Sequence, residues 1–262
     1  MSRTEHEWRA EPYRAANGVQ VRAALKALAG AGLPRDGRFA DVGCGSGEVA
    51  EAMARRGLTV DACDISESMV DAARARCAAL PVTVERQDAR RLSLRPGAYD
   101  VVHSSWMLHW LAEADHAVRT MARAVAPGGT LVLQYSAGQP RADGFALRDT
   151  LRAVADRPAW RDRLTDAPIV FYQHPADEVS LLLAAEGLAV SPVEPVAQDL
   201  GAGDLDRLRA ALRAATFAAQ AEVLGDDTDA FIDECLAALA AAGALDPHNV
   251  CIVARRPPLT RV

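Results

Sequence analysis

The apolar positions between residues 35 and 135 fall into short runs separated by amphipathic stretches. The runs are rich in Val, Leu and aromatic residues, a composition typical of buried strands. They cover residues 39–42, 58–63, 82–87, 99–103 and 130–134. The stretches between them show helical spacing, and the connecting segments are short. This alternation predicts an α/β fold, built as a doubly wound and mostly parallel sheet.

The flanking regions have a different pattern. We expect residues 1–34, where apolar positions recur at helical spacing, to form an N-terminal helical lid. Residues 35–135 and 186–262 are expected to form the core of the domain. Residues 136–185 and 203–245 are expected to form a helical cap inserted around the core. The alternative is that these helices are solvated and only thicken the domain.

Composition narrows the choice of partner and compartment. The 262 residues hold 29 Lys and Arg against 35 Asp and Glu, a net charge of −6, and no basic stripe. Nucleic acid is therefore a disfavoured partner. No apolar run has the length of a membrane span, and the five cysteines form no metal-type cluster. We expect a cytoplasmic, metal-independent protein with a small-molecule partner. The Ala-rich face of 204–244 is expected either to cover the core or to form the interface of a homodimer.

The strongest local signal is the segment FADVGCGSGEVA, residues 39–50. Asp41 ends a strand, Gly43, Gly45 and Gly47 follow at alternate positions, and a helix then begins. Glycines at such a turn let the backbone approach a ligand closely. A dinucleotide loop would read G-x-G-x-x-G, and an acid in the loop suits an ammonium group better than a pyrophosphate. The spacing therefore disfavours a dehydrogenase.

Two further acids follow the next two predicted strands. Asp64 is placed to accept hydrogen bonds from both hydroxyls of a ribose. Asp88 is placed to accept from an adenine amino group, while the backbone N–H of Ala89 meets the ring. Each Asp has an alternative role as a helix N-cap. Together with the glycine loop, the two acids indicate an adenosine site at the carboxyl edge of the sheet.

In order and spacing, the segments DVGCGSG, VDACDISESM, QDA, YDVVHSSWMLHW and VAPGGTLVL resemble the successive motifs of class I S-adenosylmethionine-dependent methyltransferases. The resemblance covers residues 39–134. It implies a seven-stranded sheet with an antiparallel last strand and S-adenosyl-L-methionine as the cofactor. The residues that it places at the cofactor are Asp41, Gly43, Cys44, Gly45, Gly47, Asp64, Ile65, Met69, Asp88, Ala89 and Ser104.

Two shorter segments resemble a subgroup that methylates carboxylates. PYRAANGVQ is similar to the N-terminal segment of juvenile hormone acid methyltransferases, and LHWL is similar to a segment that these enzymes share with trans-aconitate methyltransferases. The malonyl-carrier-protein methyltransferase of biotin synthesis is similar as well. The resemblance implies Gln20 and Trp110 as residues on the carboxylate side and Tyr13 as part of the lid.

The role expected of the histidines depends on the chemical class of the methyl acceptor. A carboxylate is already ionised at neutral pH, whereas a phenol, alcohol or carbon acid needs a base, for which histidine is suited. The candidates are His103, at the end of a strand, and His109. Either could act as a base or orient an acceptor oxygen as a neutral donor, with a purely structural role as the alternative. Trp106 and Trp110 are expected either to wall the substrate pocket or to pack in the core. The catalytic candidates are thus His103, His109 and Gln20, and the substrate-binding candidates are Tyr13, Gln20, Trp106, His109 and Trp110.

The favoured function is O-methylation of a carboxylate on a small organic acid or natural-product intermediate. The first alternative is methylation of carbon, nitrogen or a phenolic oxygen with a histidine base. The second is a binding or cyclising protein that keeps the cofactor pocket without transferring a methyl group.

Overall fold

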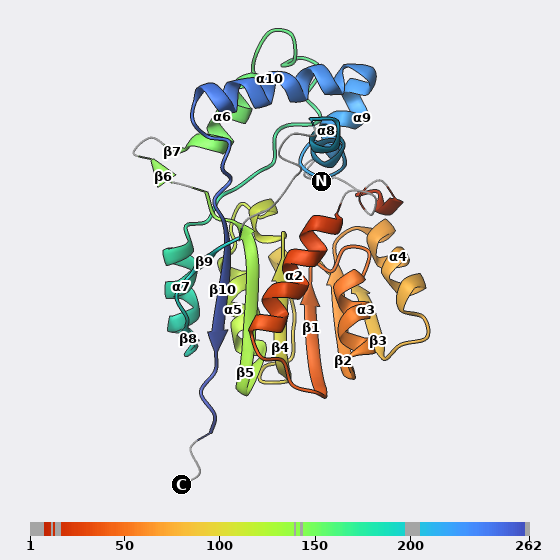
Figure 1. The fold of residues 1–262 in the computed structure, drawn as a ribbon, viewed down its shortest axis with the longest axis vertical. Helices are drawn as coiled ribbons and strands as arrows, with labels where there is room; N and C mark the ends of the chain where they lie inside the picture. Colours follow the sequence, from red (N-terminus) through yellow and green to blue (C-terminus); the bar gives the residue numbers. More distant parts are fainter. Residues whose placement is uncertain are drawn as a thin grey trace.

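The computed structural model describes residues 8–11, 13, 17–138, 140–141, 144–196 and 205–259. An eight-stranded sheet forms its centre, with the order β3-β2-β1-β4-β5-β10-β8 and with β9 paired to β10 (Figure 1). The strand bounds are β1 Gly37–Val42, β2 Leu58–Asp64, β3 Val82–Arg86, β4 Tyr99–Ser105, β5 Val125–Ser136, β8 Ala189–Val190, β9 Glu194–Pro195 and β10 Asn249–Arg255.

The predicted doubly wound sheet is confirmed. Strands β1 to β5 are mutually parallel, and β10 runs antiparallel to β5, as the family resemblance implied. The eighth strand arises because the segment 189–195 is divided into β8 and β9. Pro192 lies between them, and proline has no N–H with which to continue a ladder.

Side chains of alternate strand residues enter two separate apolar layers. Phe39 and Val101 point to the layer that contains α2 Gly18–Gly30, α3 Glu48–Arg55 and α4 Glu67–Cys77. Their neighbours Ala40 and Val102 point to the layer of α5 Asp115–Ala124 and α7 Ala176–Ala185. This two-residue period buries both faces of the sheet, and the ligand edge at the strand ends stays open.

Helix α2 corrects the expected extent of the lid. Its residues Ala24 and Leu28 are completely buried in the layer against Phe39 and Met53. The Gln134 side chain also donates to the carbonyl of Ala23, from the middle of the sheet. Residues 18–30 therefore belong to the core, and a lid within the expected 1–34 is limited to the segment before Gly18.

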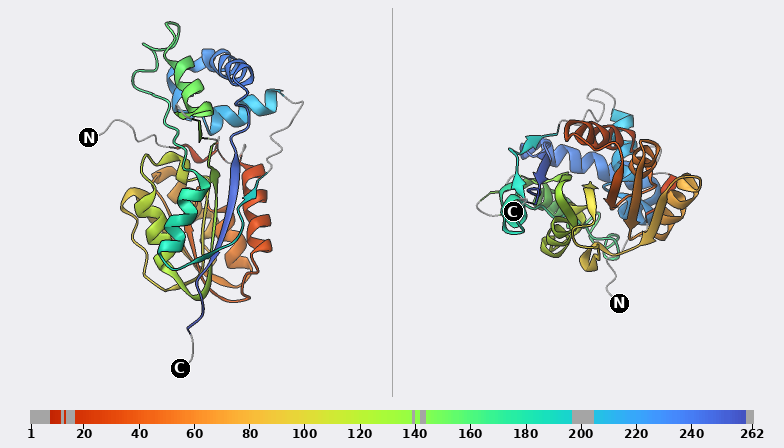
Figure 2. Two further views of the ribbon diagram at one scale, coloured as in Figure 1. Left: turned by 90° about the vertical axis from the view of Figure 1, so that its left-hand side faces the viewer. Right: turned by 90° about the horizontal axis from the view of Figure 1, so that it is seen from below.

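The cap is smaller than expected and has a hydrophobic core of its own. Its helices lie above the carboxyl ends of the strands (Figures 1 and 2). They are α6 Ala146–Ala155, α8 Leu205–Ala214, α9 Ala218–Leu224 and α10 Thr228–Ala241. Their core contains Trp160, Phe217 and Phe231. Helix α7, which we expected in the cap, instead buries Val179 and Leu183 in the sheet layer.

Three elements of the cap region depart in detail from the sequence pattern. The expected helical stretch 204–244 is divided, because Gly225 adopts φ 57° at the end of α9. The hairpin β6 Pro140–Arg141 and β7 Gly144–Phe145 was not predicted, and α6 lies within the expected helical cap 136–185, although its bounds were not predicted. Within the part of the chain that the structure describes, no helix is long and apolar enough to cross a membrane.

Candidate active site

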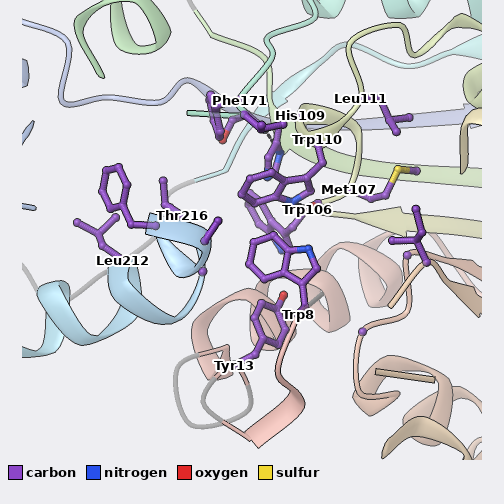
Figure 3. A pocket seen from close by; sticks show the side chains of 18 of the residues that line it. Trp8, Tyr13, Trp106, Met107, His109, Trp110, Leu111, Phe171, Leu212 and Thr216 are labelled. Carbon is purple, nitrogen blue, oxygen red and sulfur yellow. Dashed lines mark hydrogen bonds between the residues drawn. The ribbon is translucent and has the colours of Figure 1, made fainter. Parts of the chain in front are cut away.

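A cavity of about 980 Å³ lies between the carboxyl edge of the sheet and the cap. The volume is at the upper end of the range for small-molecule sites, so a cofactor and a second molecule have room in it. One end is lined by the glycine loop and the strand ends, and the other by cap helices. In the middle, the rings of Trp8, Trp106 and Trp110 gather above Tyr13 (Figure 3).

The glycine loop between β1 and α3 has left-handed backbone geometry. Gly43, Gly45 and Gly47 have φ angles of 76°, 53° and 84°. At Gly43 a Cβ would lie 2.8 Å from Met107, and at Gly47 it would lie 2.9 Å from the Cβ of Ala73. At Gly45 the nearest atom would be in the Tyr13 ring, 3.6 Å away. The outer two glycines are thus required by packing, whereas Gly45 keeps the cavity side of the loop open.

Asp64 stands at the end of β2 and joins the glycine loop to the next turn. Its Oδ2 accepts from the Gly45 N–H at 2.9 Å, and its Oδ1 accepts from the Ser66 N–H at 3.0 Å. Burial raises the pKa of this carboxyl group. Each oxygen can accept a further hydrogen bond, and Asp64, Ile65 and Met69 all line the cavity. This is the donor and acceptor chemistry that a ribose needs, so the loop and Asp64 fit the expected cofactor.

Asp88 and Ala89 line the same end of the cavity. Asp88 also caps a short 3-10 helix, because its Oδ1 accepts from the Arg90 N–H at 2.9 Å. Burial opposes ionisation of Asp88, but hydrogen bonds from Arg90 hold its pKa below the usual value. The capping role was the alternative considered for this residue, and it does not displace Asp88 from the cavity. Contact with adenine stays a prediction.

Several residues predicted to bind the cofactor support the loop from behind it. Neither Cys44, Ser104 nor Asp41 lines the cavity. The Ser104 hydroxyl donates to the Val42 carbonyl at 2.7 Å, and the neighbouring Ser105 lines the cavity instead. Burial, first of all, raises the pKa of the Cys44 thiol well above its ordinary value, so the thiol stays protonated.

His103 does not occupy the position expected of a catalytic base. Its Nδ1 lies 2.8 Å from Asp41 Oδ1, and its ring stacks on Phe39 with centroids 5.9 Å apart. The side chain is 1% exposed and lies outside the cavity lining. The physical reason is the strand period, which turns His103 to the same side as Phe39. We therefore correct its assignment from a catalytic residue to a buried partner of Asp41.

His109, in contrast, lies in the cavity lining, between the rings of Trp110 and Phe171 (Figure 3). Its Nδ1 accepts a long hydrogen bond of 3.5 Å from the Ser136 N–H. Burial, with a smaller contribution from His174, lowers the pKa of His109 to about 3. The imidazole is therefore neutral at pH 7. With Nδ1 as the acceptor, the proton of this cavity-lining side chain is on Nε2, which has no hydrogen-bond partner among the described residues.

The N-terminal segment closes the middle of the cavity. The Tyr13 hydroxyl donates to Gln20 Oε1 at 3.1 Å, so two of the predicted substrate-binding residues lie together and the Gln20 amide N–H groups are left for another partner. Trp8 packs against Trp110 and Tyr13, with centroid separations of 4.8 and 6.3 Å. Sequence reasoning missed Trp8, because no periodic pattern marks a single aromatic residue so near the start of the chain.

The two predicted tryptophans have different roles from each other. The Trp110 Nε1–H donates to the Trp106 carbonyl at 3.0 Å, so this indole presents its ring rather than its N–H to the cavity. Trp106 has a φ of 61°, a conformation uncommon for a bulky residue, and its buried Nε1 has no hydrogen-bond partner in the described part of the chain. Both indoles line the cavity, and their contact with a substrate stays a prediction.

The cap wall of the cavity was not predicted residue by residue. Its apolar residues include Leu147, Leu151, Leu212, Leu236, Leu239 and Leu245. Leu147 and Leu151 are four residues apart, and Val154 follows three residues later, so helical spacing could have marked α6. Within the described residues, no group of three or more His, Cys, Asp and Glu side chains is arranged to hold a metal ion.

The part of the chain that contains the glycine loop is similar to known proteins. Residues 40–133 match the family model of the methyltransferase domain. These residues form an S-adenosylmethionine-dependent methyltransferase domain. The match begins in β1 and ends in β5, so it contains the glycine loop, Asp64 and Asp88. The resemblance inferred from the sequence motifs is thereby confirmed, as is S-adenosylmethionine as the cofactor of the domain.

Relatives of the methyltransferase domain act on different acceptors. The chain is 30% identical over 168 residues to trans-aconitate 2-methyltransferase of Paracidovorax citrulli, covering 63% of this chain and 62% of the relative. It is 35% identical over 142 residues to ubiquinone biosynthesis O-methyltransferase of Xanthomonas campestris pv. campestris (strain B100), covering 52% and 57%. The aligned part thus spans about three fifths of the length of these relatives.

The fold of the methyltransferase domain is shared with solved structures. An S-adenosylmethionine-dependent methyltransferase from Mesorhizobium loti is similar with a TM-score of 0.57 and 23% identity. The similarity covers 91% of this chain and 100% of that chain. This comparison supports the Rossmann-like arrangement of sheet and helices.

Proposed function

We propose that this protein transfers a methyl group from S-adenosylmethionine to the carboxylate oxygen of a small-molecule acceptor. Bound at the glycine loop, the cofactor supplies an electrophilic methyl carbon on a sulfonium sulfur. Gly45 leaves the loop accessible, and Asp64 offers oxygens to the ribose. Asp41, held by His103, supports the loop from below.

The observation that carries the proposal is the state of His109. A base for a phenol or an amine needs a free ring nitrogen with a pKa near the working pH. His109 is neutral with a pKa of about 3, and its Nδ1 already accepts the Ser136 N–H. What it offers to the cavity is a hydrogen-bond donor. A donor suits an acceptor oxygen that is already an anion, and among the common acceptors a carboxylate is ionised at pH 7.

The residues of the chain would then act by positioning the acceptor and not by removing a proton from it. The His109 Nε2–H and the Gln20 amide would orient the carboxylate, and the indoles of Trp106 and Trp110 would exclude water. Alignment of nucleophile, methyl carbon and leaving sulfur can provide much of the rate in such a displacement. This assignment follows the trans-aconitate relatives in reaction type, and the ubiquinone relatives keep a phenolic oxygen as the second candidate.

The proposal is tested by screening small acids, phenols and amines for release of S-adenosylhomocysteine. We expect release with carboxylic acids and a rate that is nearly constant from pH 6 to 9. Activity with phenols or amines alone, with a rate that falls on acidification through the ordinary pKa of histidine, would favour the second candidate.

A further inference from the structure

The cap end of the cavity is an apolar chamber, defined here by Leu147, Leu151, Leu212, Leu236, Leu239 and Leu245. Leu245 is 54% exposed although it lines the cavity, and Val223, which is 44% exposed, also lines it. Exposed large apolar side chains that border a concave site are typical of a surface that an apolar ligand covers. His109 and the residues of the chamber line the same cavity.

The polar side chains at this end already have partners within the protein. The Gln220 amide donates to the carbonyls of Ala167 and Pro168, at 3.0 and 2.9 Å. The Ser136 hydroxyl donates to Asn249 Oδ1 at 2.6 Å. The Gln220 amide and the Ser136 hydroxyl are therefore already engaged, and His109 and Gln20 are among the lining side chains that can still donate to a carboxylate.

Charge in the cavity is separated between its two ends. The arginines of the lining, Arg86 and Arg90, stand at the cofactor end, where Arg90 pairs with Asp88 at 2.7 Å. Among the described residues, the charged side chains that line the cap end are the acids Asp166 and Glu222. Arg9 approaches from outside, is 76% exposed in its side chain, and pairs with Glu222 at 3.3 Å.

A ligand with several carboxylates would fit this environment badly. A buried carboxylate needs a cation or several hydrogen-bond donors, and an unpaired one carries a large desolvation cost. The donors at His109 and Gln20 are enough for one carboxylate. Any second or third carboxylate would enter the apolar chamber, whose lining contains no Lys or Arg among the described residues.

Resting on the proposed carboxylate methylation, we propose that the acceptor is a monocarboxylic acid with an extended apolar body, rather than a polycarboxylate such as trans-aconitate. The carboxylate end lies at His109 and Gln20, and the apolar body fills the chamber beneath α6, α8 and α10. The cap, which the sheet does not need for its own core, then serves to select the acceptor.

The first test compares straight-chain monocarboxylic acids of increasing length with trans-aconitate, using S-adenosylhomocysteine release as the signal. We expect kcat/KM to rise about three- to fourfold for each methylene group until the chamber is full. Trans-aconitate is expected to be a poor substrate. Calorimetry of decanoic acid with the protein loaded with S-adenosylhomocysteine gives a readout that does not depend on turnover.

The second test places a cation in the chamber. Leu245→Arg should lower kcat/KM for decanoic acid by about tenfold, because an apolar contact is lost and a charge is brought close. The same variant should raise the ratio of kcat/KM for trans-aconitate to kcat/KM for decanoic acid. The matched control is Leu181→Arg on α7, whose leucine is 70% exposed and lies outside the cavity lining. Neither substitution opens a hole in a buried core.

The outcomes separate this inference from the proposed function. Equal kcat/KM values for trans-aconitate and decanoic acid would overturn the inference of an apolar monocarboxylic acceptor. They would leave the proposed carboxylate methylation intact. Turnover of phenols or amines without any acid would overturn the proposed function itself. Absence of saturable decanoic acid binding, or equal effects of Leu245→Arg and Leu181→Arg, would overturn the inference.

Discussion

His103 and Asp41 form a buried pair beneath the glycine loop, with Nδ1 and Oδ1 2.8 Å apart and side chains that are 1% and 2% exposed. The pair joins β4 to β1 just where the loop begins. Asp41 Oδ2 and His103 Nε2 have no hydrogen-bond partner among the residues that the structure describes. His103 therefore stabilises the carboxylate that ends β1, and through it the start of the loop.

His103→Phe should destabilise the protein by about 1–3 kcal/mol, because both oxygens of a buried carboxylate then lack a partner. His103→Asn, which keeps an N–H donor, should cost less. Both variants should retain kcat within about tenfold at saturating cofactor, since His103 lies outside the cavity. Urea unfolding and steady-state rates measure the two effects. A loss of kcat beyond a hundredfold at unchanged stability would return His103 to the role of base.

Acid should destabilise the protein partly through His109. Its pKa is about 3 in the folded protein and near 6.5 in the unfolded chain, so between these values the unfolded state binds the extra proton. The free energy of unfolding therefore falls as the pH decreases through this window, by about 1.4 kcal/mol per pH unit from this residue.

His109→Gln removes this contribution while keeping a neutral donor. Between pH 6.5 and 5, wild type should lose about 2 kcal/mol more unfolding free energy than the variant. Its rate should fall only about tenfold, the scale of one neutral hydrogen bond. Parallel stability curves, or a rate loss above a thousandfold, would contradict the assignment of a neutral, donating His109.

Tyr13 and Gln20 should act as a unit on the acceptor. The Tyr13 hydroxyl holds Gln20 Oε1 at 3.1 Å, which orients the amide N–H groups. Tyr13→Phe and Gln20→Ala should each raise KM for the acceptor by about three- to tenfold, with the double variant no worse than the more severe single variant. Cofactor affinity, measured by calorimetry, serves as the control for each. Fully additive effects would show that the two residues act independently.

Gly45→Ala separates cofactor binding from backbone strain. Gly45 and Gly97 have similar φ angles, 53° and 62°, and a Cβ would clash at neither position. Both alanine variants should therefore lose about 1 kcal/mol of stability. Only Gly45→Ala adds a methyl group on the cavity side of the loop. This variant should therefore lower the affinity for S-adenosylmethionine by tenfold or more. Equal affinities in the two variants would place the cofactor away from Gly45.

The sheet could be predicted because its strands are short apolar runs, and the loops after them carry glycines and acids that are typical of a ligand site. Asp64 and Asp88 follow strands that are adjacent in the sheet, so their positions at the carboxyl edge came directly from the order of the elements. His103 was misplaced, although the alternation of Val101, Val102 and His103 contained the signal. A two-residue period puts His103 on the same side as Val101, in the core beneath the loop.

The cap could not be derived in the same way. Its helices pack on each other around Trp160 and Phe231, and their apolar positions do not indicate which surface they cover. The hydrogen bond from Trp110 to the Trp106 carbonyl depends on the φ of 61° at Trp106. No propensity of tryptophan predicts that conformation. Contacts of this kind follow from tertiary packing, so the sequence pattern could identify candidates without assigning their roles.

The most direct test of the central claim is the alkali stability of the methylated product. Protein, acceptor and S-adenosylmethionine labelled in the methyl group are incubated, and the product is treated with mild alkali. A methyl ester hydrolyses and releases its label as volatile methanol, whereas methyl groups on phenolic oxygen, nitrogen or carbon withstand this treatment. Our account predicts that the transferred label becomes volatile. Label that stays with the acceptor after alkali would contradict it.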